Sequence, residues 1–167
     1  MKLRFLCLLA FLLVVSRPTW AQNITKYDVN ITNNLDTFYV KVNVPKTLSK
    51  TNNVFQFAAT APGTYQTMNI GRFVSNFKAF SKSGKEIKTS FVAPNQYVFK
   101  KPKKVSYVTY NIAETFDTKV KQLPIYLMAG TTIEADHSLL NTHGICGYFK
   151  GFQTDPVEVK INPKENW

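Results

Sequence analysis

The chain has 167 residues, of which 44% are hydrophobic and 14% aromatic, and it carries a formal net charge of +11. This length suits one domain with one sizeable core. No internal repeat or low-complexity linker occurs, which excludes a repeat architecture.

The first 21 residues have the pattern of a secretory signal peptide. Lys2 and Arg4 precede an apolar run over residues 5–15, and small residues occupy the last and third-last positions of the segment that ends at Ala21. We expect cleavage after Ala21, which leaves residues 22–167 exported to the periplasm or the cell exterior. An uncleaved membrane anchor is the alternative, but the apolar run is shorter than the roughly 20 residues that span a bilayer.

Loss of the signal peptide changes both the charge and the cysteine count. Three basic residues leave with it, so 18 basic residues face 10 acidic ones in the mature chain. Cys146 is then the only cysteine, and no intramolecular disulfide can form. Its neighbours Ile145 and Tyr148 favour a buried small residue over a reactive thiol.

Alternation of apolar and polar residues predicts β-strands along most of the mature chain. An NNLD hairpin joins the first two, and turns at Ser83-Gly84 and Lys101-Pro102 divide the longest segments. We expect an all-β fold, an antiparallel β-sandwich with one or two short helical turns. The strands are predicted within residues 24–32, 38–45, 53–60, 74–92, 95–114 and 156–163. The side chains expected to point inward are Tyr27, Val29, Ile31, Phe38, Val40, Val42, Val44, Phe55 and Phe57.

Residues 61–74, APGTYQTMNIGRFV, interrupt the alternation. A helical spacing of apolar residues from Ile70 predicts a turn or two of helix before the next strand. Gly71 would let the backbone approach another segment closely. Arg72 would pair with a carboxylate or lie satisfied in a crossover between the sheets. The candidate carboxylates are Asp117, Glu134 and Asp136.

Residues 123–152 form the second interruption and hold both histidines of the chain. The sequence has no His-Glu-x-x-His motif, nucleophile elbow, phosphate-binding loop or dinucleotide fingerprint. We therefore expect a long loop, with no catalytic residue, cofactor-binding residue or metal ligand. An enzyme that uses His137, His143 and Cys146 is the alternative, and it requires these three side chains to lie together in the fold.

Lysines concentrate in residues 78–88, KAFSKSGKEIK, and 100–104, KKPKK. Our main interpretation is that they protect exposed strand edges and hairpins from pairing with other chains. Binding of anionic envelope polymers or substrates is the alternative. Interleaved aromatic residues would also suit nucleic acid, but the expected export argues against that partner.

Three segments follow one another in an order that carries a family resemblance. Residues 61–87 fit the pattern Pro-Gly-x-Tyr…Arg-x-Val-x-x-Phe-x-Ala-x-x-x-x-Gly, and residues 95–114 hold two paired strands. Residues 136–167 contain Asp-His, Asn, an aromatic residue, Pro-x-x-Val-x-Ile and a final Pro…Trp. This order resembles the N-terminal domain of the glycyl-aminopeptidase-like metallopeptidases, which are secreted zinc enzymes that often carry a PDZ domain.

The resemblance implies a β-sandwich placed against a catalytic domain, which would be the partner in cis. In that family a His-Glu-x-x-His helix and a downstream glutamate of the next domain hold the zinc. This sequence has no such motif and stops at Trp167. We therefore expect a non-catalytic domain that is inactive as a peptidase alone and binds no cofactor.

The resemblance also implies an interdomain or cleft-edge surface. The closing motif would line the edge of a substrate cleft, and the Pro-Gly-x-Tyr and Arg positions would support it. These residues are Tyr65, Arg72, His137, Asn141, Gly144 and Tyr148. The alternative function is a stand-alone exported module that binds a glycan or an anionic polymer, with an aromatic patch and salt-sensitive binding. Peptide or glycan would then be a partner, and nucleic acid would not.

Overall fold

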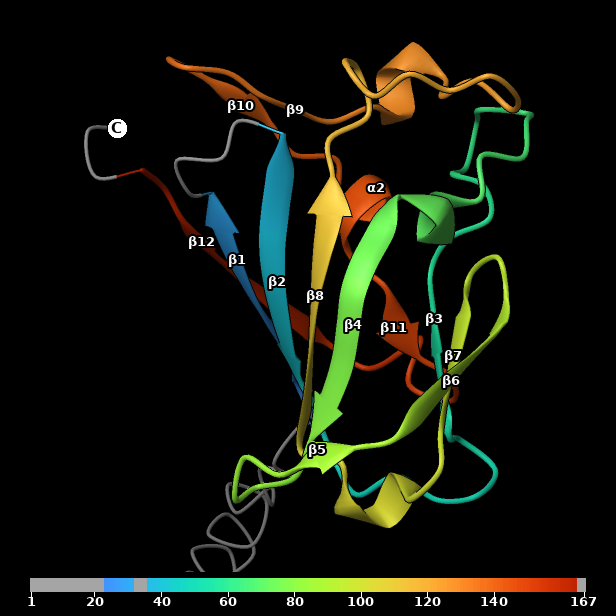
Figure 1. The fold of residues 1–167 in the computed structure, drawn as a ribbon, viewed down its shortest axis with the longest axis vertical. Helices are drawn as coiled ribbons and strands as arrows, with labels where there is room; N and C mark the ends of the chain where they lie inside the picture. Colours follow the sequence, from blue (N-terminus) through green and yellow to red (C-terminus); the bar gives the residue numbers. More distant parts are fainter. Residues whose placement is uncertain (1–22, 32–35, 165–167) are drawn as a thin grey trace, which may run out of the picture.

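The computed structural model describes residues 23–31 and 36–164, which form two packed β-sheets and a short ribbon (Figure 1). The predicted all-β sandwich is confirmed. The predicted signal peptide lies outside the described residues. None of the described helices has the length and apolar character needed to cross a membrane.

The strands divide between a six-stranded and a four-stranded sheet. The larger sheet has the order β12 (Val157–Asn162), β1 (Thr25–Ile31), β2 (Thr37–Asn43), β8 (Tyr107–Ala113), β4 (Val74–Phe80) and β5 (Glu86–Ile87). The smaller sheet has the order β11 (Tyr148–Phe149), β3 (Val54–Gln56), β7 (Gln96–Phe99) and β6 (Thr89–Ala93).

Short elements mark the two ends of the sandwich. At the end called upper here, the ribbon of β9 (Thr132–Ile133) and β10 (Ser138–Leu139) lies with η1 (Ile70–Phe73), η3 (Leu127–Ala129) and α2 (Thr142–Ile145). The opposite, lower end carries η2 (Pro102–Lys104) and the turn between β4 and β5 (Figure 1).

The predicted alternation of apolar and polar residues determines which side chains of the large sheet face the core. Tyr27, Val29 and Ile31 are buried, and Ile31 lies opposite Phe38 in the antiparallel pair of β1 and β2. Phe38, Val40 and Val42 are also buried, whereas Val44 is partly buried. The predicted NNLD hairpin falls mostly outside the described residues.

One pair departs from the antiparallel expectation. Strand β12 runs parallel to β1, with Val159 opposite Tyr27, because the chain enters this edge at the same end as β1. The side chains of β12 that face the inside of the sandwich remain exposed, since the narrower sheet does not reach under them. They are Val157 at 62%, Val159 at 38% and Ile161 at 47%.

Aromatic side chains fill the space between the sheets. Phe55 of β3 and Phe57, which follows β3, are fully buried, as predicted. The ring of Phe57 meets that of Tyr110 edge-on at 5.0 Å, and Phe55 meets Phe149 at 4.9 Å. Offset and edge-to-face aromatic pairs add to the free energy gained from burial alone. The aromatic layer therefore contributes to the stability of the described domain.

Two buried tyrosine hydroxyls tie the segment after α2 to the large sheet. The Tyr110 hydroxyl donates to the Ile145 carbonyl at 2.9 Å, and the Tyr27 hydroxyl donates to the Gly147 carbonyl at 2.6 Å. Burial raises the pKa of both phenols. Cys146 lies between these carbonyls, and burial raises the pKa of its thiol to about 12. Cys146 packs partly buried against the core, in line with the prediction of a structural thiol.

Residues 70–73 form one helical turn, within the turn or two that the spacing of apolar residues predicts. The turn η1 is a 3-10 helix that ends at Phe73, and Phe77 belongs to β4. Gly71 makes the close approach that we expected. A Cβ atom there would lie 2.2 Å from the Pro94 carbonyl oxygen, and the Gly71 amide donates to Asn95 Oδ1 at 2.9 Å.

We expect Tyr110→Phe to lower the free energy of unfolding by about 1–3 kcal/mol, because the Ile145 carbonyl loses its buried donor. Urea unfolding measures the change. The control is Tyr39→Phe on the outer face of β2, which we expect to change stability by less than roughly 0.5 kcal/mol. Equal effects of the two substitutions would contradict the role of the Tyr110 hydroxyl.

The raised pKa values of Tyr27, Tyr110 and Cys146 predict a loss of stability in alkaline solution. Their neutral forms are favoured in the folded chain, so the contribution is complete below the unfolded pKa values of about 8.5 and 10 and falls as the pH rises above them. Urea unfolding between pH 7 and pH 11 measures this dependence. We expect a shallower fall between pH 8.5 and 10 in Cys146→Ala, and an unchanged slope would argue against burial of the thiol.

Candidate interdomain surface

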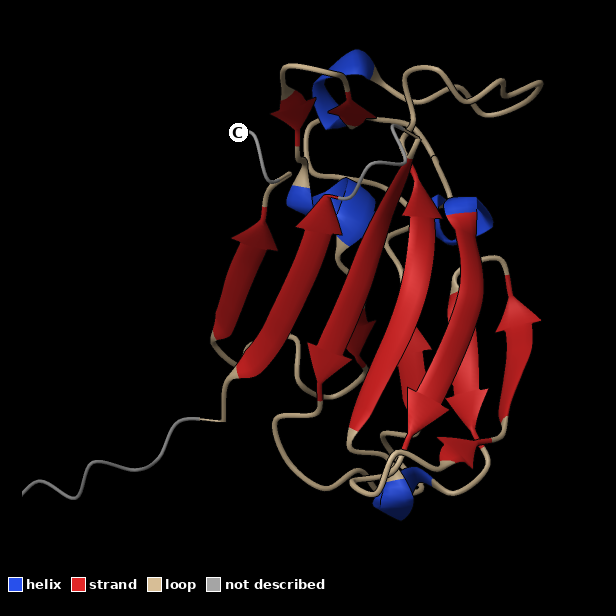
Figure 2. Cartoon of the chain, turned by 60° about the vertical axis from the view of Figure 1, so that its left-hand side comes forward, coloured by secondary structure: helices blue, strands red, loops and turns tan. Residues whose placement is uncertain are grey.

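Loops build the upper end of the sandwich, where most of the predicted site residues lie (Figure 2). Tyr65 and Arg72 belong to the crossover from β3 to β4, His137 to the turn between β9 and β10, and Asn141 and Gly144 to α2 and its cap. Tyr148 instead begins β11 in the smaller sheet. The structure thus brings five of the six residues to one end.

Arg72 binds backbone carbonyls of a neighbouring loop. Its Nη1 donates to the Gln122 carbonyl at 2.6 Å, and its Nη2 donates to the Leu123 carbonyl. The predicted pairing with Asp117, Glu134 or Asp136 is wrong, because the planar fork of donors fits two successive carbonyls. The alternative expectation is confirmed: Arg72 lies in the crossover between the sheets with its side chain hydrogen-bonded.

A second contact joins the same two loops. Gln66 Nε2 donates to the Pro124 carbonyl at 2.6 Å, six residues before Arg72 in the crossover. The guanidinium of Arg72 also lies 4.8 Å from the centre of the Phe73 ring. The crossover therefore holds residues 122–124 at three carbonyls.

Two exposed apolar residues of these loops have a left-handed backbone. Tyr65 has φ of 52° and Leu123 has φ of 53°. This region is unfavourable for bulky side chains and persists where the surrounding contacts enforce it. Thr60 Oγ1 donates to the Gln66 carbonyl at 2.6 Å, which closes the turn beneath Tyr65. The fully exposed ring of Tyr65 is thus presented on a fixed turn.

Apolar side chains gather around these loops in what we call the loop-end patch. Leu127 and Met128 of η3 are 77% and 80% exposed. Asn141 Nδ2 donates to the Met128 carbonyl at 2.9 Å, and a Cβ atom on Gly144 would lie 3.0 Å from the Thr131 methyl group. Asn141 and Gly144 therefore support η3 from below. The patch consists of Tyr65, Leu123, Tyr126, Leu127 and Met128.

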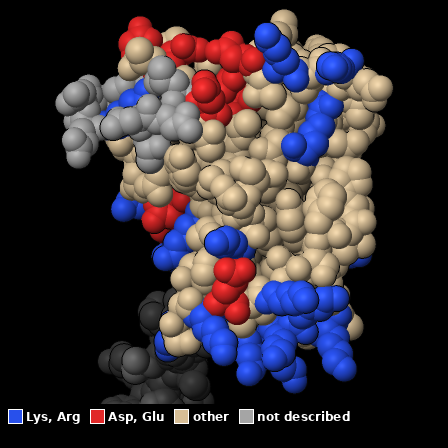
Figure 3. Space-filling model, in the orientation of Figure 1, with Lys and Arg blue, Asp and Glu red and all other residues tan. Residues whose placement is uncertain are grey.

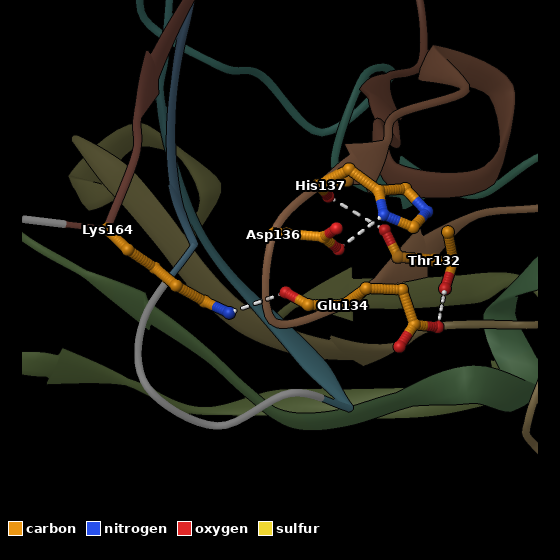
Figure 4. Close-up of polar contacts among 6 residues, drawn as sticks. Thr132, Glu134, Asp136, His137 and Lys164 are labelled. Carbon is orange, nitrogen blue, oxygen red and sulfur yellow. Dashed lines mark hydrogen bonds and ion pairs between the residues drawn. The ribbon is translucent and has the colours of Figure 1, made fainter. Parts of the chain in front are cut away.

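An acidic hollow of about 720 Å³ lies beside the β9–β10 turn, whose polar contacts are drawn in Figure 4. His137 Nδ1 lies 2.8 Å from Asp136 Oδ1, and this hydrogen bond lowers the pKa of the Asp136 carboxyl. Thr132 Oγ1 donates to Glu134 Oε1 at 2.9 Å. Figure 3 shows the acidic atoms of this end together. The hollow is lined by Phe116, Asp117, Thr132, Glu134, Ala135, Asp136, His137, Ser138 and Leu139.

Glu114 is a buried carboxyl that the sequence analysis did not single out. It is 1% exposed and accepts hydrogen bonds from the Phe116 and Asp117 amides at 3.1 and 2.8 Å. Burial raises its pKa, and these two hydrogen bonds oppose that rise. Glu114 thereby sets the turn at which the chain leaves β8 for the upper end. One sequence signal could have identified Glu114: it stands at the end of a predicted strand, before a run of turn-forming residues.

The described residues give no support to chemistry at His137, His143 and Cys146. Both histidines are exposed, whereas Cys146 packs against the core. In residues 23–31 and 36–164, no group of three or more His, Cys, Asp and Glu side chains is placed to hold a metal ion. These three residues are therefore not brought together as a site.

Comparisons with known proteins agree on the kind of domain. The model of the Peptidase M61 N-terminal domain family matches residues 26–167. A crystal structure described as the aminopeptidase N family protein from Idiomarina loihiensis superposes with a TM-score of 0.71 at 14% identity, over 85% of this chain. That match covers 22% of the other chain and shows a shared fold. A search of the curated proteins found no match.

We expect Arg72→Ala to loosen the loop that contains residues 122–124, because two carbonyls lose their donor. Amide hydrogen exchange of the segment around Leu123 should accelerate at least about tenfold, while the exchange of β8 stays unchanged. Arg72→Lys should rescue only part of the protection, since an ammonium group lacks the planar fork. Unchanged exchange in Arg72→Ala would contradict this role.

Proposed function

This chain belongs to the Peptidase M61 N-terminal domain family, and from that premise we propose that it is a non-catalytic domain whose upper end packs against a catalytic metallopeptidase domain. The observation that carries the proposal is the loop-end patch. Large apolar side chains that cluster on a surface mark sites of contact with another protein.

The composition and rigidity of the patch suit an interface. Tyrosine and methionine are enriched where proteins meet, and aromatic anchors tend to dominate the binding energy. Tyr65 stands on a closed turn, and Arg72 fixes the backbone of Leu123. A surface that is already ordered loses less conformational entropy when it binds.

The path of the chain supports attachment in cis at the same end. Lys164 Nζ donates to the Glu134 carbonyl at 2.7 Å, so the last described residues run beside the β9–β10 turn (Figure 4). A catalytic domain joined after these residues would connect to the upper end, the end that also carries the loop-end patch. A covalent connection would raise the effective concentration of the two surfaces.

The proposed roles of the individual residues follow from these contacts. His137 and the acidic hollow would lie at the edge of a substrate cleft, and Tyr65 would reach the partner directly. Asn141 and Gly144 would act through η3, which they support. Tyr148 begins a core strand, so its contribution would be structural.

The remaining elements of the proposal rest on the sequence. The chain contains no His-Glu-x-x-His motif, which supports a non-catalytic role, and its first 21 residues support export to the periplasm or the cell exterior. We expect the purified chain to hydrolyse no peptide substrate. Chelator-sensitive hydrolysis would contradict the non-catalytic role.

A binding experiment tests the docking surface. The purified chain is mixed with a separately produced M61 catalytic domain from the same organism, and complex formation is measured by light scattering after size-exclusion chromatography. We expect Leu127→Asp combined with Met128→Asp to weaken association at least about tenfold, because charges would be buried unpaired.

The matched control is Val157→Asp combined with Val159→Asp on β12, which also adds two charges at exposed apolar positions. This pair should leave association unchanged. Loss of binding in the β12 variant alone would move the docking surface to that edge. An immunoblot of the native product tests attachment in cis: a product several times larger than the chain supports it, and a product of domain size contradicts it.

A further inference from the structure

Lysines dominate the lower end of the sandwich, opposite the loop-end patch. Figure 3 shows them as a nearly continuous basic surface at this end. Between residues 82 and 104 the sequence contains seven lysines and one acidic residue, Glu86. The carboxylate of Glu86 lies 3.8 Å from Lys78 Nζ, which comes from β4 outside this group. The lysines are Lys82, Lys85, Lys88, Lys100, Lys101, Lys103 and Lys104.

Several of these side chains surround a hollow of about 250 Å³. The lysines around it come from the turn before β5, from the residue between β5 and β6, and from the start and end of η2. Buried Pro102 begins η2, and the Lys104 amide donates to the Lys101 carbonyl at 3.0 Å, which fixes the backbone of this turn. The hollow is lined by the lysines Lys85, Lys88, Lys100, Lys101 and Lys104, together with Glu86 and Ile87.

The arrangement carries an electrostatic cost. The Lys100 amide donates to the Lys88 carbonyl at 3.1 Å, next to the paired residues Thr89 and Phe99. Lys88 and Lys100 are therefore opposite one another just beyond the paired ends of β6 and β7, where like charges repel. An anion between them would remove this repulsion.

Protection of strand edges from pairing with other chains explains only some of the lysines of the lower end. Strands β5 and β6 are the edges of their sheets, so Lys85 and Lys88 lie where protective lysines are expected. Lys101, Lys103 and Lys104 belong to a 3-10 turn and its cap, which offer no edge to protect. The hollow and the turn thus call for a different explanation.

We propose that the lower end binds an anionic polysaccharide, with sulfate or carboxylate groups of successive sugars seated among the lysines of the hollow. Single-stranded nucleic acid is a poorer fit, because its bases stack on aromatic platforms and the exposed aromatic rings of the described residues lie at the upper end and on β6. A lipid surface usually also receives apolar side chains, and Ile87 in this hollow is buried.

This inference is independent of the proposed docking. The loop-end patch and the lysine hollow lie at opposite ends of one rigid sandwich, so each can be occupied while the other is bound (Figures 1 and 3). The domain would then hold a peptidase on a charged polymer.

Calorimetric titration of the purified chain with a heparin decasaccharide tests the proposal. We expect Lys101→Gln combined with Lys104→Gln to weaken binding at least about tenfold and to lower the slope of log affinity against log salt by about 1–2. The matched control is Lys119→Gln combined with Lys121→Gln, which removes the same charge from exposed lysines of the upper end. This control should bind within about twofold of the parent chain.

Three outcomes would overturn the proposal: no binding to heparin in 50 mM salt, equal loss in both double variants, or tighter binding to a single-stranded oligonucleotide or to phosphatidylglycerol vesicles than to heparin. Circular dichroism of all variants separates loss of binding from loss of fold. A polygalacturonate fragment in a second titration tells carboxylate from sulfate recognition.

Discussion

The backbone of residues 145–147 is the point on which most of the fold depends. Two buried hydroxyls, of Tyr27 and Tyr110, donate to carbonyls of this short stretch, and a Cβ atom on Gly147 would lie 2.4 Å from the ring of Phe55. A polar group buried without a partner costs free energy, so these bonds fix where the chain passes. The position of residues 145–147 in turn determines where the neighbouring elements α2 and β11 lie. Among the upper loops, η3 is supported by α2 and its cap.

The two ends of the sandwich have different chemistry because the topology sends different connections to each. The long crossovers from β3 to β4 and from β8 to β9 meet at the upper end and can expose apolar side chains on backbone held by hydrogen bonds. The lower end receives tight turns, where lysine side chains extend into water.

Sequence periodicity predicted the strands and the inward side chains well, because alternation is a local property of one strand. The motif order also indicated the family. It could not predict the partner of Arg72, since a backbone carbonyl leaves no mark on the sequence and a carboxylate is the more obvious choice. It missed the parallel pairing of β12, which depends on the end at which the chain enters the sheet. The loop-end patch and the lysine hollow draw residues from separate segments, which only the fold brings together.

Tyr65 and Leu123 keep left-handed backbone angles that glycine or asparagine would adopt at lower cost. Engineering guided by thermal stability alone would favour such replacements, and it would remove one aromatic and one aliphatic side chain from the loop-end patch. We expect a domain stabilised in this way to bind less tightly in the proposed docking. At these two positions, melting temperature and the proposed docking are therefore separate targets, and a library should be screened for both.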